Sequence, residues 1–230
     1  MDDELDLKGF SGRARLFPLP GVAMFPHVVA PLHIFEPRYR RMTEDALEGD
    51  RLIATVRLVP PGPAPPRGPS PEVAEVACLG RIVHHERLAD GRFNILLLGL
   101  RRARILREPR DADLPYRTAD LALIEEQPPR EDEAAGREAL AGRLREAFGA
   151  AGGADAEFLR MLDSAASLAA LTDVIAHALP FPAEFKQALL GEPSADARAR
   201  LLGRRIADLA PGAASPLPRK KTFPPPFSDN

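Results

Sequence analysis

The stretch from Leu16 to Phe35 contains no Asp, Glu, Lys or Arg, and it limits what this chain can fold into more than any other part of the sequence. A membrane helix needs about 20 mostly apolar residues, so the stretch is long enough to span a bilayer. However, Pro18, Pro20, Pro26 and Pro31 lie inside it, and a proline in a helix interior costs about 3 kcal/mol or more. Irregular backbone cannot cross lipid, because its polar groups would stay unpaired. We therefore predict short, buried, extended segments in a globular core, and no membrane partner.

Length and composition indicate an ordinary globular protein. A chain of 230 residues suits one large domain or two small ones, and its formal net charge of -2 gives no global sign of a nucleic-acid partner. Cys78 is the single cysteine, which excludes an internal disulfide and a multi-cysteine zinc site. Asp2, Asp3 and Glu4 stand where a secretory signal peptide would be positively charged. These features predict a cytoplasmic protein.

Alternation of apolar and polar residues predicts a strand-rich first half of the chain. The expected strands are residues 52–59, 76–88, 93–106 and 116–124. Asp90-Gly91 is a strong hairpin signal between the two longest of them. Gly99 interrupts the second long strand, and the alternation of inward-facing and outward-facing residues is shifted between its two sides. This change predicts a β-bulge that bends the strand.

A short helix is expected at residues 37–48. Pro37 suits the first turn of a helix, and Gly49 suits its end. Between them, Tyr39, Met42 and Ala46 recur at helical spacing on one face.

The periodicity becomes helical after Pro128-Pro129. Leu168, Leu171 and Ile175 belong to one apolar stripe, and Ser194 can cap a last helix. Strands followed by helices imply an α+β chain. The expected parts are a flexible N-terminus at 1–12, a strand-rich subdomain at 13–127, a helical subdomain at 128–210 and a disordered tail at 211–230.

Proline is concentrated in two segments, at residues 60–71 and 211–226. Such segments cannot form regular helix or sheet hydrogen bonds, so the first predicts an extended loop and the second a disordered tail. A polyproline ligand for an aromatic groove is the alternative function of either segment. We prefer the linker interpretation, because neither contains a clear PxxP motif with a well-placed basic residue.

Motifs that would indicate an enzyme are absent from the sequence. It contains neither a G-x-x-x-x-G-K-[ST] phosphate loop nor a G-x-S-x-G nucleophile elbow. His84 and His85 are adjacent on an expected strand, so they point to opposite faces and cannot readily chelate one metal. One of them beside Glu86 could act as a proton shuttle, although an ordinary strand histidine is the simpler interpretation. We expect no catalytic residue, no metal and no cofactor.

A basic cluster lies on the second long strand. Its members are Arg101, Arg102, Arg104 and Arg107. Such a cluster can contact phosphates. Aromatic residues are only 6% of the chain, which leaves few platforms for base stacking. We therefore prefer a solvated strand and expect no nucleic-acid partner.

Several motifs occur together in a family-specific order. They are Phe17-Pro18-Leu19-Pro20, Phe25-Pro26, Pro31-Leu32, Ile34-Phe35-Glu36, Arg38-Tyr39-Arg40 with Met42, Gly80-Arg81-Ile82, Gly99-Leu100-Arg101-Arg102, and LPFPAEFKQALL near the end. With them, the chain resembles the Lon protease N-terminal, or substrate-binding, domain family from about Arg13 to Leu209. It is similar to a stand-alone bacterial-type member without the ATPase and protease domains.

The resemblance implies an α+β fold in which a PUA-like β-barrel precedes a C-terminal helical bundle. It implies a non-enzymatic module that binds unfolded or damaged polypeptides, as an adaptor in protein quality control. A separate ATP-dependent protease is the second expected partner. An RNA-binding PUA-like module is the alternative function, and it depends on fold analogy and the arginine cluster.

The resemblance also divides its signature residues into structural and binding ones. We expect Phe17, Phe25 and Phe35 to fill the core of the strand-rich subdomain. The candidates for polypeptide contact are their expected exposed neighbours Arg38, Tyr39 and Met42.

Overall fold

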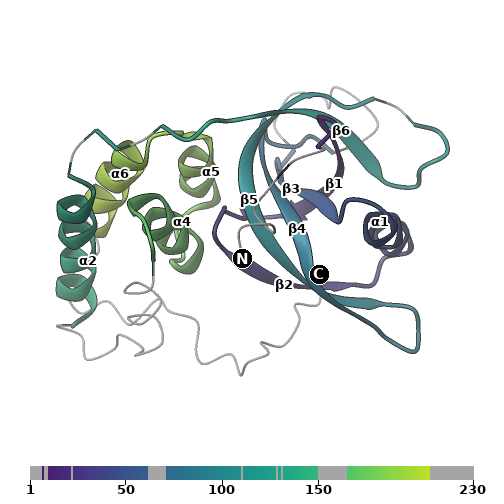
Figure 1. The fold of residues 1–230 in the computed structure, drawn as a ribbon, viewed down its shortest axis with the longest axis horizontal. Coiled ribbons are helices and arrows are strands. Elements are labelled where there is room, and N and C mark those ends of the chain that lie inside the picture. Colours follow the sequence, from purple (N-terminus) through teal and green to yellow (C-terminus); the bar gives the residue numbers. More distant parts are fainter. Residues whose placement is uncertain are drawn as a thin grey trace. The chain divides into compact units, whose positions relative to one another are not determined.

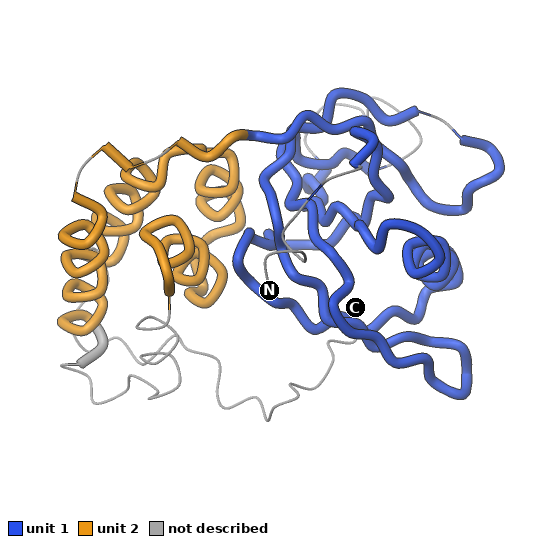
Figure 2. Tube along the Cα trace, viewed as in Figure 1, with its two compact units in different colours: residues 1–124, 222–230 blue, residues 125–221 orange. Residues whose placement is uncertain are grey.

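The structure is a computed structural model that describes residues 7, 10–21, 23–61, 71–109, 111–127, 129–130, 132–149 and 165–207. The chain divides into two compact units between Ile124 and Glu125, close to the predicted change at Gln127 (Figure 2). The predictions for residues 1–12 and 60–71 lie largely outside the described residues, and the prediction for 211–230 lies wholly outside them.

The first unit is built on a mixed six-stranded sheet (Figure 1). Its strands are β1 (Arg13–Pro20), β2 (Val29–Ile34), β3 (Leu52–Leu58), β4 (Val76–Arg87), β5 (Phe93–Arg107) and β6 (Arg117–Leu123). The strand order is β2-β5-β4-β3-β1-β6, and β6 pairs with β5 as well as with β1. Only the β1–β3 pair is parallel among these pairings. The four predicted strands and the α+β class are confirmed.

Apolar side chains on one face of this sheet form the core of the first unit. They include Leu16, Ala54, Leu79, Leu100 and Ala119, none of which is more than 1% exposed. Alanines at central positions let neighbouring elements approach closely, as the dense packing of protein interiors requires. The sheet ladder meanwhile pairs the backbone groups that run through this apolar interior.

β5 carries the predicted bulge at Gly99. Gly80 pairs with Gly99 whereas Leu79 pairs with Arg101, so Leu100 is the extra residue on β5. A Cβ at Gly99 would lie 2.1 Å from the Phe25 carbonyl oxygen, because the segment before β2 crosses β5 at this point. Only glycine permits this approach without moving backbone. The bulge therefore lets the buried segment around Phe25 close over the sheet.

Helix α1 (Pro37–Glu48) has the predicted bounds. Pro37 stands at the start, where a missing amide hydrogen leaves no helical bond unmade. Tyr39, Met42 and Ala46 are buried on one face, as their spacing predicts.

Asp45 fixes the exposed side of α1 to the strands. Its carboxylate accepts a hydrogen bond of 2.7 Å from the Tyr116 hydroxyl and pairs with Arg41 at 2.9 Å. Its backbone carbonyl accepts a hydrogen bond of 2.8 Å from Arg15 of β1, which also pairs with Asp50. These bonds set the position of α1 on the sheet.

The second unit is helical. Its described helices are α2 (Glu133–Gly149), α4 (Leu168–Ala178), α5 (Ala183–Gly191) and α6 (Ala195–Ala207). Ser194 accepts a hydrogen bond from the Ala197 amide at 3.3 Å, which confirms the predicted cap of the last helix. Ser167 caps α4 in the same way, through the Ala170 amide at 3.1 Å. Residues 150–164 of the predicted helical subdomain lie outside the described part.

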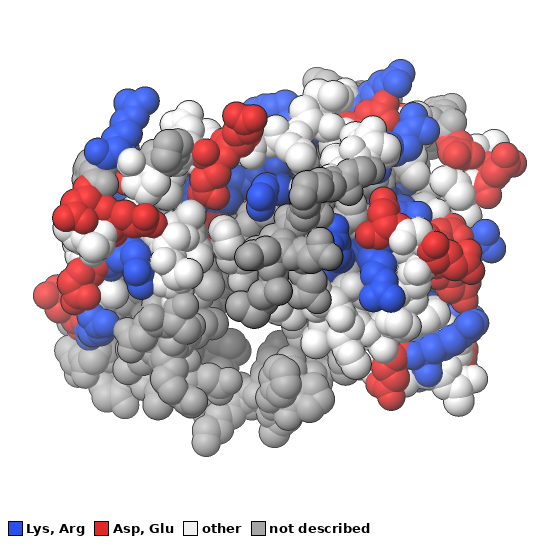
Figure 3. Space-filling view, viewed as in Figure 1, with Lys and Arg blue, Asp and Glu red and all other residues white. Residues whose placement is uncertain are grey.

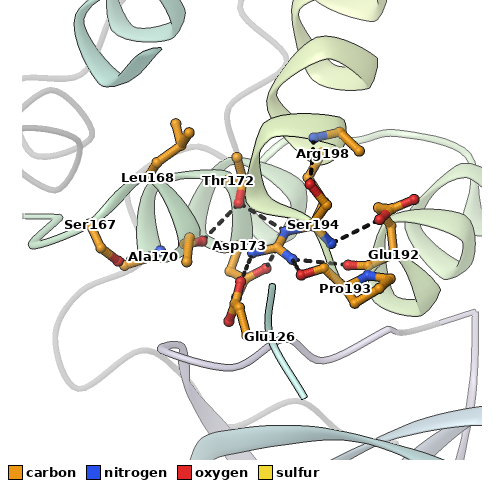
Figure 4. Close-up of polar contacts among 12 residues, drawn as sticks. Glu126, Ser167, Leu168, Ala170, Thr172, Asp173, Glu192, Pro193, Ser194 and Arg198 are labelled. Atoms are coloured by element: carbon orange, nitrogen blue, oxygen red, sulfur yellow. Dashed lines mark hydrogen bonds and ion pairs between the residues drawn. The ribbon is translucent and has the colours of Figure 1, made fainter. Parts of the chain in front are cut away.

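A buried guanidinium joins the parts of the helical unit (Figure 4). Arg198 of α6 is only 1% exposed, and it pairs with Glu126 in the segment that enters the unit. Its Nε donates to the Thr172 hydroxyl at 3.0 Å and lies 3.6 Å from the carboxylate of Asp173, both on α4. A buried charge needs partners of this kind, because desolvation disfavours it.

The same guanidinium also donates hydrogen bonds to the backbone that follows α5. Its Nη1 donates to the carbonyl of Glu192 at 2.9 Å and to that of Pro193 at 3.3 Å. Carbonyls beyond a helix C-terminus have no intrahelical partner. Arg198 therefore joins the entering segment, α4 and the α5–α6 turn through one side chain.

Candidate functional site

A groove in the first unit lies where β1, the end of β2 and the start of α1 meet. Its cavity volume is about 220 Å³. The lining residues are Phe17, Pro18, Leu19, Pro20, His33, Ile34, Phe35, Glu36, Arg38, Tyr39 and Leu58. Most of them belong to the uncharged stretch that dominates the sequence. We refer to this site as the β1–α1 groove.

Aromatic rings form the inner wall of the β1–α1 groove. Phe17 and Tyr39 meet edge to face with ring centroids 4.6 Å apart. The Arg38 guanidinium lies 4.5 Å above the Tyr39 ring, a cation–π contact that covers its face. Phe17 and Tyr39 are 5% and 7% exposed, so both rings line the groove while most of their surface is packed against the protein.

Phe35 forms the outer rim of the groove. Its side chain is 38% exposed, and its ring stacks with His33 at a centroid distance of 6.2 Å. The prediction that Phe35 fills the core is therefore wrong, whereas Phe17 and Phe25 are buried as predicted. The physical reason is that β2 ends at Ile34, so the in–out alternation of the strand does not extend to Phe35.

The charged groups at the groove are paired with each other. Arg38 and Glu36 form an exposed ion pair of 2.8 Å, which contributes little to stability in water but places two opposite charges at the rim. Burial raises the pKa of the Tyr39 hydroxyl above its ordinary value, while the positive charge of Arg38 opposes the shift. Tyr39 thus presents a neutral hydroxyl at physiological pH, which suits contact with apolar and uncharged groups.

Prolines occupy the strand edges beside the groove. The Leu121 amide donates a hydrogen bond of 2.7 Å to the Gly12 carbonyl. The backbone N–H and C=O groups of every second β1 residue therefore point toward the β6 side, and by this alternation Pro18 and Pro20 are among those residues. β6 pairs with β1 only as far as Leu16, which leaves these prolines on an edge that β6 does not cover.

The edge of β2 follows the same rule. The Gly99 amide donates to the Val28 carbonyl at 2.9 Å, so Pro31 faces away from β5 by alternation. Proline has no amide hydrogen to donate to an added strand. These prolines therefore disfavour the addition of an outside strand at either edge.

The structure separates the three predicted contact residues. Arg38 and Tyr39 line the β1–α1 groove. Met42 does not line it, and its side chain is 0% exposed. The expectation that Met42 is exposed is therefore wrong, because it lies on the buried face of α1 that its spacing with Ala46 had predicted. Sequence reasoning missed His33, Phe35 and Leu58 as groove residues.

The other candidate residues lie away from the groove. His84, His85 and Glu86 are exposed on β4, where Glu86 accepts a hydrogen bond of 3.2 Å from Asn94. In the described part of the chain, no three His, Cys, Asp or Glu residues are grouped as metal ligands would be. None of the helices described is long and apolar enough to cross a membrane.

The arginines of the β5 cluster do not all lie on the same side of the strand. Arg102 is 3% exposed, whereas Arg101, Arg104 and Arg107 face solvent. Arg104 pairs with Glu75 and Arg107 pairs with Asp120. On the face shown in Figure 3, basic and acidic side chains are intermingled. The cluster therefore does not form a uniformly basic patch for phosphates.

Comparison with known proteins identifies the family. The family model described as the ATP-dependent protease La (LON) substrate-binding domain matches residues 13–208. The chain belongs to this family. The groove residues all lie inside the matched range, so the candidate site is part of the family domain.

Relatives and solved structures agree with this assignment. The chain is 37% identical over 92 residues to Lon protease 2 of Desulfotalea psychrophila and 30% identical over 129 residues to the Lon protease of Azospirillum brasilense. These matches span only 12% and 16% of the two proteases' own length.

The fold is similar to two solved Lon N-terminal domains. A crystal structure from Xanthomonas campestris matches with a TM-score of 0.60 at 21% identity, covering 86% of this chain and 99% of that one. The N-terminal domain of a Mycobacterium avium complex Lon protease matches with a TM-score of 0.64 at 15% identity, covering 86% and 100%.

Proposed function

We propose that this chain binds unfolded or partly folded polypeptides without catalysing a reaction on them, and that the β1–α1 groove receives their apolar side chains. The observation that carries the proposal is an aromatic-walled groove with a half-exposed phenylalanine at its rim, inside a Lon substrate-binding domain. In this role the chain acts in the cytoplasm as an adaptor that delivers clients to a separate ATP-dependent protease.

The size of the groove indicates how clients bind. A cavity of about 220 Å³ is smaller than the roughly 300 to 1,000 Å³ of sites that enclose a whole small-molecule ligand. It therefore holds one or two side chains of a passing segment. Apolar contacts are not directional, so affinity is modest and the preference among apolar clients is broad.

A binding titration with matched variants tests this proposal. The probe is a reduced and alkylated, fluorescently labelled unfolded protein, added to the wild type and to Phe35→Ala. Phe35→Ala removes a ring that lines the groove, so it weakens binding by about tenfold, equivalent to about 1.4 kcal/mol. Because the ring is already 38% exposed, the melting temperature changes little. The matched control is Leu106→Ala, which removes an exposed apolar side chain from β5 outside the groove.

The result is read from the difference between the two variants. Equal loss of binding in Phe35→Ala and Leu106→Ala would indicate a non-specific apolar surface and contradict the groove assignment. Absence of binding to the wild type up to high micromolar protein would contradict the binding function itself. Repeating the titration at higher salt separates apolar capture, which persists, from phosphate-type contacts, which weaken steeply.

A further inference from the structure

A row of polar side chains crosses three strands beside the β1–α1 groove and reaches the His33 ring. His33 of β2 lies opposite Asn94 of β5 in the strand register, and Asn94 lies opposite Glu86 of β4. The Nδ1 of His33 is 2.8 Å from the Oδ1 of Asn94, and the Nδ2 of Asn94 donates to the Glu86 carboxylate at 3.2 Å. On the other side of the ring, Nε2 lies 3.2 Å from the Nη1 of Arg92. We refer to these four residues as the polar chain.

The partners at the two ends of the polar chain determine where His33 carries its proton. A carboxylate only accepts hydrogen bonds, so Asn94 turns its NH2 group toward Glu86 and its oxygen toward His33. That oxygen needs a donor, which is the Nδ1–H of His33. A guanidinium only donates, so the Nε2 of His33 must present a lone pair to Arg92. Both partners therefore select the neutral ring with its proton on Nδ1.

Arg92 is itself fixed by the connection between β4 and β5. Its Nε pairs with the Asp90 carboxylate at 2.6 Å, and its backbone amide donates to the same side chain at 3.1 Å. A Cβ added at Gly91 would lie 2.6 Å from the Nη2 of Arg40, so this connection passes close to α1. Asp90 thus offsets the charge of Arg92 and holds its guanidinium where it can donate to the ring.

We propose that His33 is a positioning residue of the β1–α1 groove. Its ring lines the groove and stacks with Phe35 at a centroid distance of 6.2 Å. Because the polar chain binds both ring nitrogens, the imidazole keeps one orientation and gives the Phe35 ring a fixed surface to stack on. The neutral form also leaves this wall without a charge that apolar side chains would have to desolvate. The inference rests on the proposed function, because it explains how the rim is kept ready for clients.

Heteronuclear NMR of the histidine rings tests the protonation state in the full chain. Correlations between the ring nitrogens and the carbon-bound ring protons show which nitrogen carries the proton. The His33 signals are those that disappear in His33→Ala, and the exposed His84 and His85 provide the reference in the same spectrum. At mildly alkaline pH we expect a single Nδ1–H form for His33 in the wild type.

The unfolded-protein titration tests whether the polar chain acts on the groove. The double variant Arg92→Ala/Asn94→Ala frees both ring nitrogens, so the two neutral forms of His33 mix. Client binding then weakens about threefold, because Phe35 loses its fixed stacking partner. The matched control is Arg104→Ala, which removes another exposed, carboxylate-paired arginine outside the groove and binds clients as the wild type does. Melting temperatures close to that of the wild type exclude unfolding as the cause.

Two outcomes would overturn the inference. One is a wild-type His33 that carries its proton on Nε2 or mixes the two neutral forms, and the other is a double variant that binds clients as tightly as the wild type. Failure of the proposed function gives a different result. A wild type that binds no client but shows the single Nδ1–H form removes the client function and leaves the assignment of the ring intact.

Discussion

The interior of the strand-rich unit and that of the helical unit contain different chemistry. In the strand-rich unit, one cluster of buried side chains consists of Ala, Leu and Val alone, although Thr43, Thr55 and Arg102 are buried elsewhere in the unit. In the unit that begins at Glu125, the guanidinium of Arg198 is almost fully buried beside the carboxylate of Asp173, which is 0% exposed. Both units are compact, so burial alone does not require an apolar side chain at every interior position.

Backbone hydrogen bonding explains this difference. Strands pair their backbone groups along the whole sheet, so the side chains on its buried face are free to be apolar. Helices leave their last carbonyls unpaired, and the segment around Glu126 enters the helical unit without regular structure. Arg198 donates to the Glu192 and Pro193 carbonyls after α5, and it pairs with Glu126 in the entering segment. The two units can therefore be perturbed by different kinds of substitution.

Two intrinsic spectroscopic signals report the unfolding of the two units separately. The chain has no tryptophan and two tyrosines, Tyr39 and Tyr116, both in the strand-rich unit. Tyrosine emission therefore reports unfolding of that unit. Circular dichroism at helical wavelengths reports mainly the helical unit, which holds α2, α4, α5 and α6.

The largest expected effect is in the strand-rich unit, from Phe25→Ala. Phe25 is 0% exposed, and its backbone lies against Gly99. Removing a buried phenylalanine ring lowers the free energy of unfolding by about 3–5 kcal/mol. The tyrosine transition should move to lower denaturant. Phe35→Ala is the control, because its ring is half-exposed, and we expect a change within about 1 kcal/mol. Equal shifts of the two variants would contradict the assignment of Phe25 to the core and Phe35 to the groove.

Arg198→Ala is the corresponding change in the helical unit. It leaves Glu126, Asp173 and two carbonyls without their shared donor. Breaking a buried ion pair in this way lowers the free energy of unfolding by about 3–5 kcal/mol. The dichroism transition should move while tyrosine emission stays. Arg204→Ala, at an exposed position of the same helix, serves as the control. A shift of the tyrosine transition instead would show that the two units do not unfold separately.

Tyr116→Phe should have a smaller effect, confined to the strand-rich unit. It removes the 2.7 Å hydrogen bond to Asp45 that fixes α1. Loss of a hydrogen bond to a charged group lowers the free energy of unfolding by about 1.5 kcal/mol or more. The measurement is the tyrosine-emission transition at neutral pH, with Tyr39 as the remaining reporter. An unchanged transition would mean that α1 is held by its apolar face alone.

The same residue predicts a pH dependence. Burial, followed by the hydrogen bond to Asp45, raises the pKa of Tyr116 to about 12. The folded state thus holds this proton more tightly than the unfolded state, whose tyrosine pKa is about 10. The stabilisation is complete below pH 10 and is lost as the pH rises from 10 through about 12. Tyr116→Phe should remove this part of the alkaline loss, and an identical alkaline profile in both proteins would refute the assignment.

Much of the strand-rich unit follows from local sequence. Alternation predicts β3 to β6, and Pro37 with Gly49 predicts both bounds of α1. Gly99 predicts the bulge, because the set of inward-facing positions shifts by one residue at this glycine, and an extra residue in the strand causes such a shift. These features depend on residues close together in the chain, so the sequence contains the information needed.

The groove and the buried arginine depend on segments that are distant in sequence. Phe35 belongs to the groove because β2 ends one residue earlier and α1 starts two residues later, with β1 packed alongside. The position of Arg198 does have a sequence signal: it precedes Leu202 and Ile206 at helical spacing, on the buried stripe of α6. What the pattern does not contain is the location of Glu126 and Asp173, which lie on other parts of the fold.

The smallest expected effect is a stabilisation of the helical unit by Gly142→Ala. Gly142 lies inside α2, and a Cβ added there would meet no atom within 4 Å. Alanine restricts the unfolded chain more than glycine does, so the free energy of unfolding should rise by about 0.5–1 kcal/mol. The dichroism transition should shift upward while the tyrosine transition stays in place. Gly99→Ala provides the opposite case, because its added Cβ would lie 2.1 Å from a backbone oxygen and must lower the stability of the strand-rich unit. If Gly142→Ala destabilised the protein instead, α2 would have to pack against atoms at Gly142, which would contradict the open surroundings of this position.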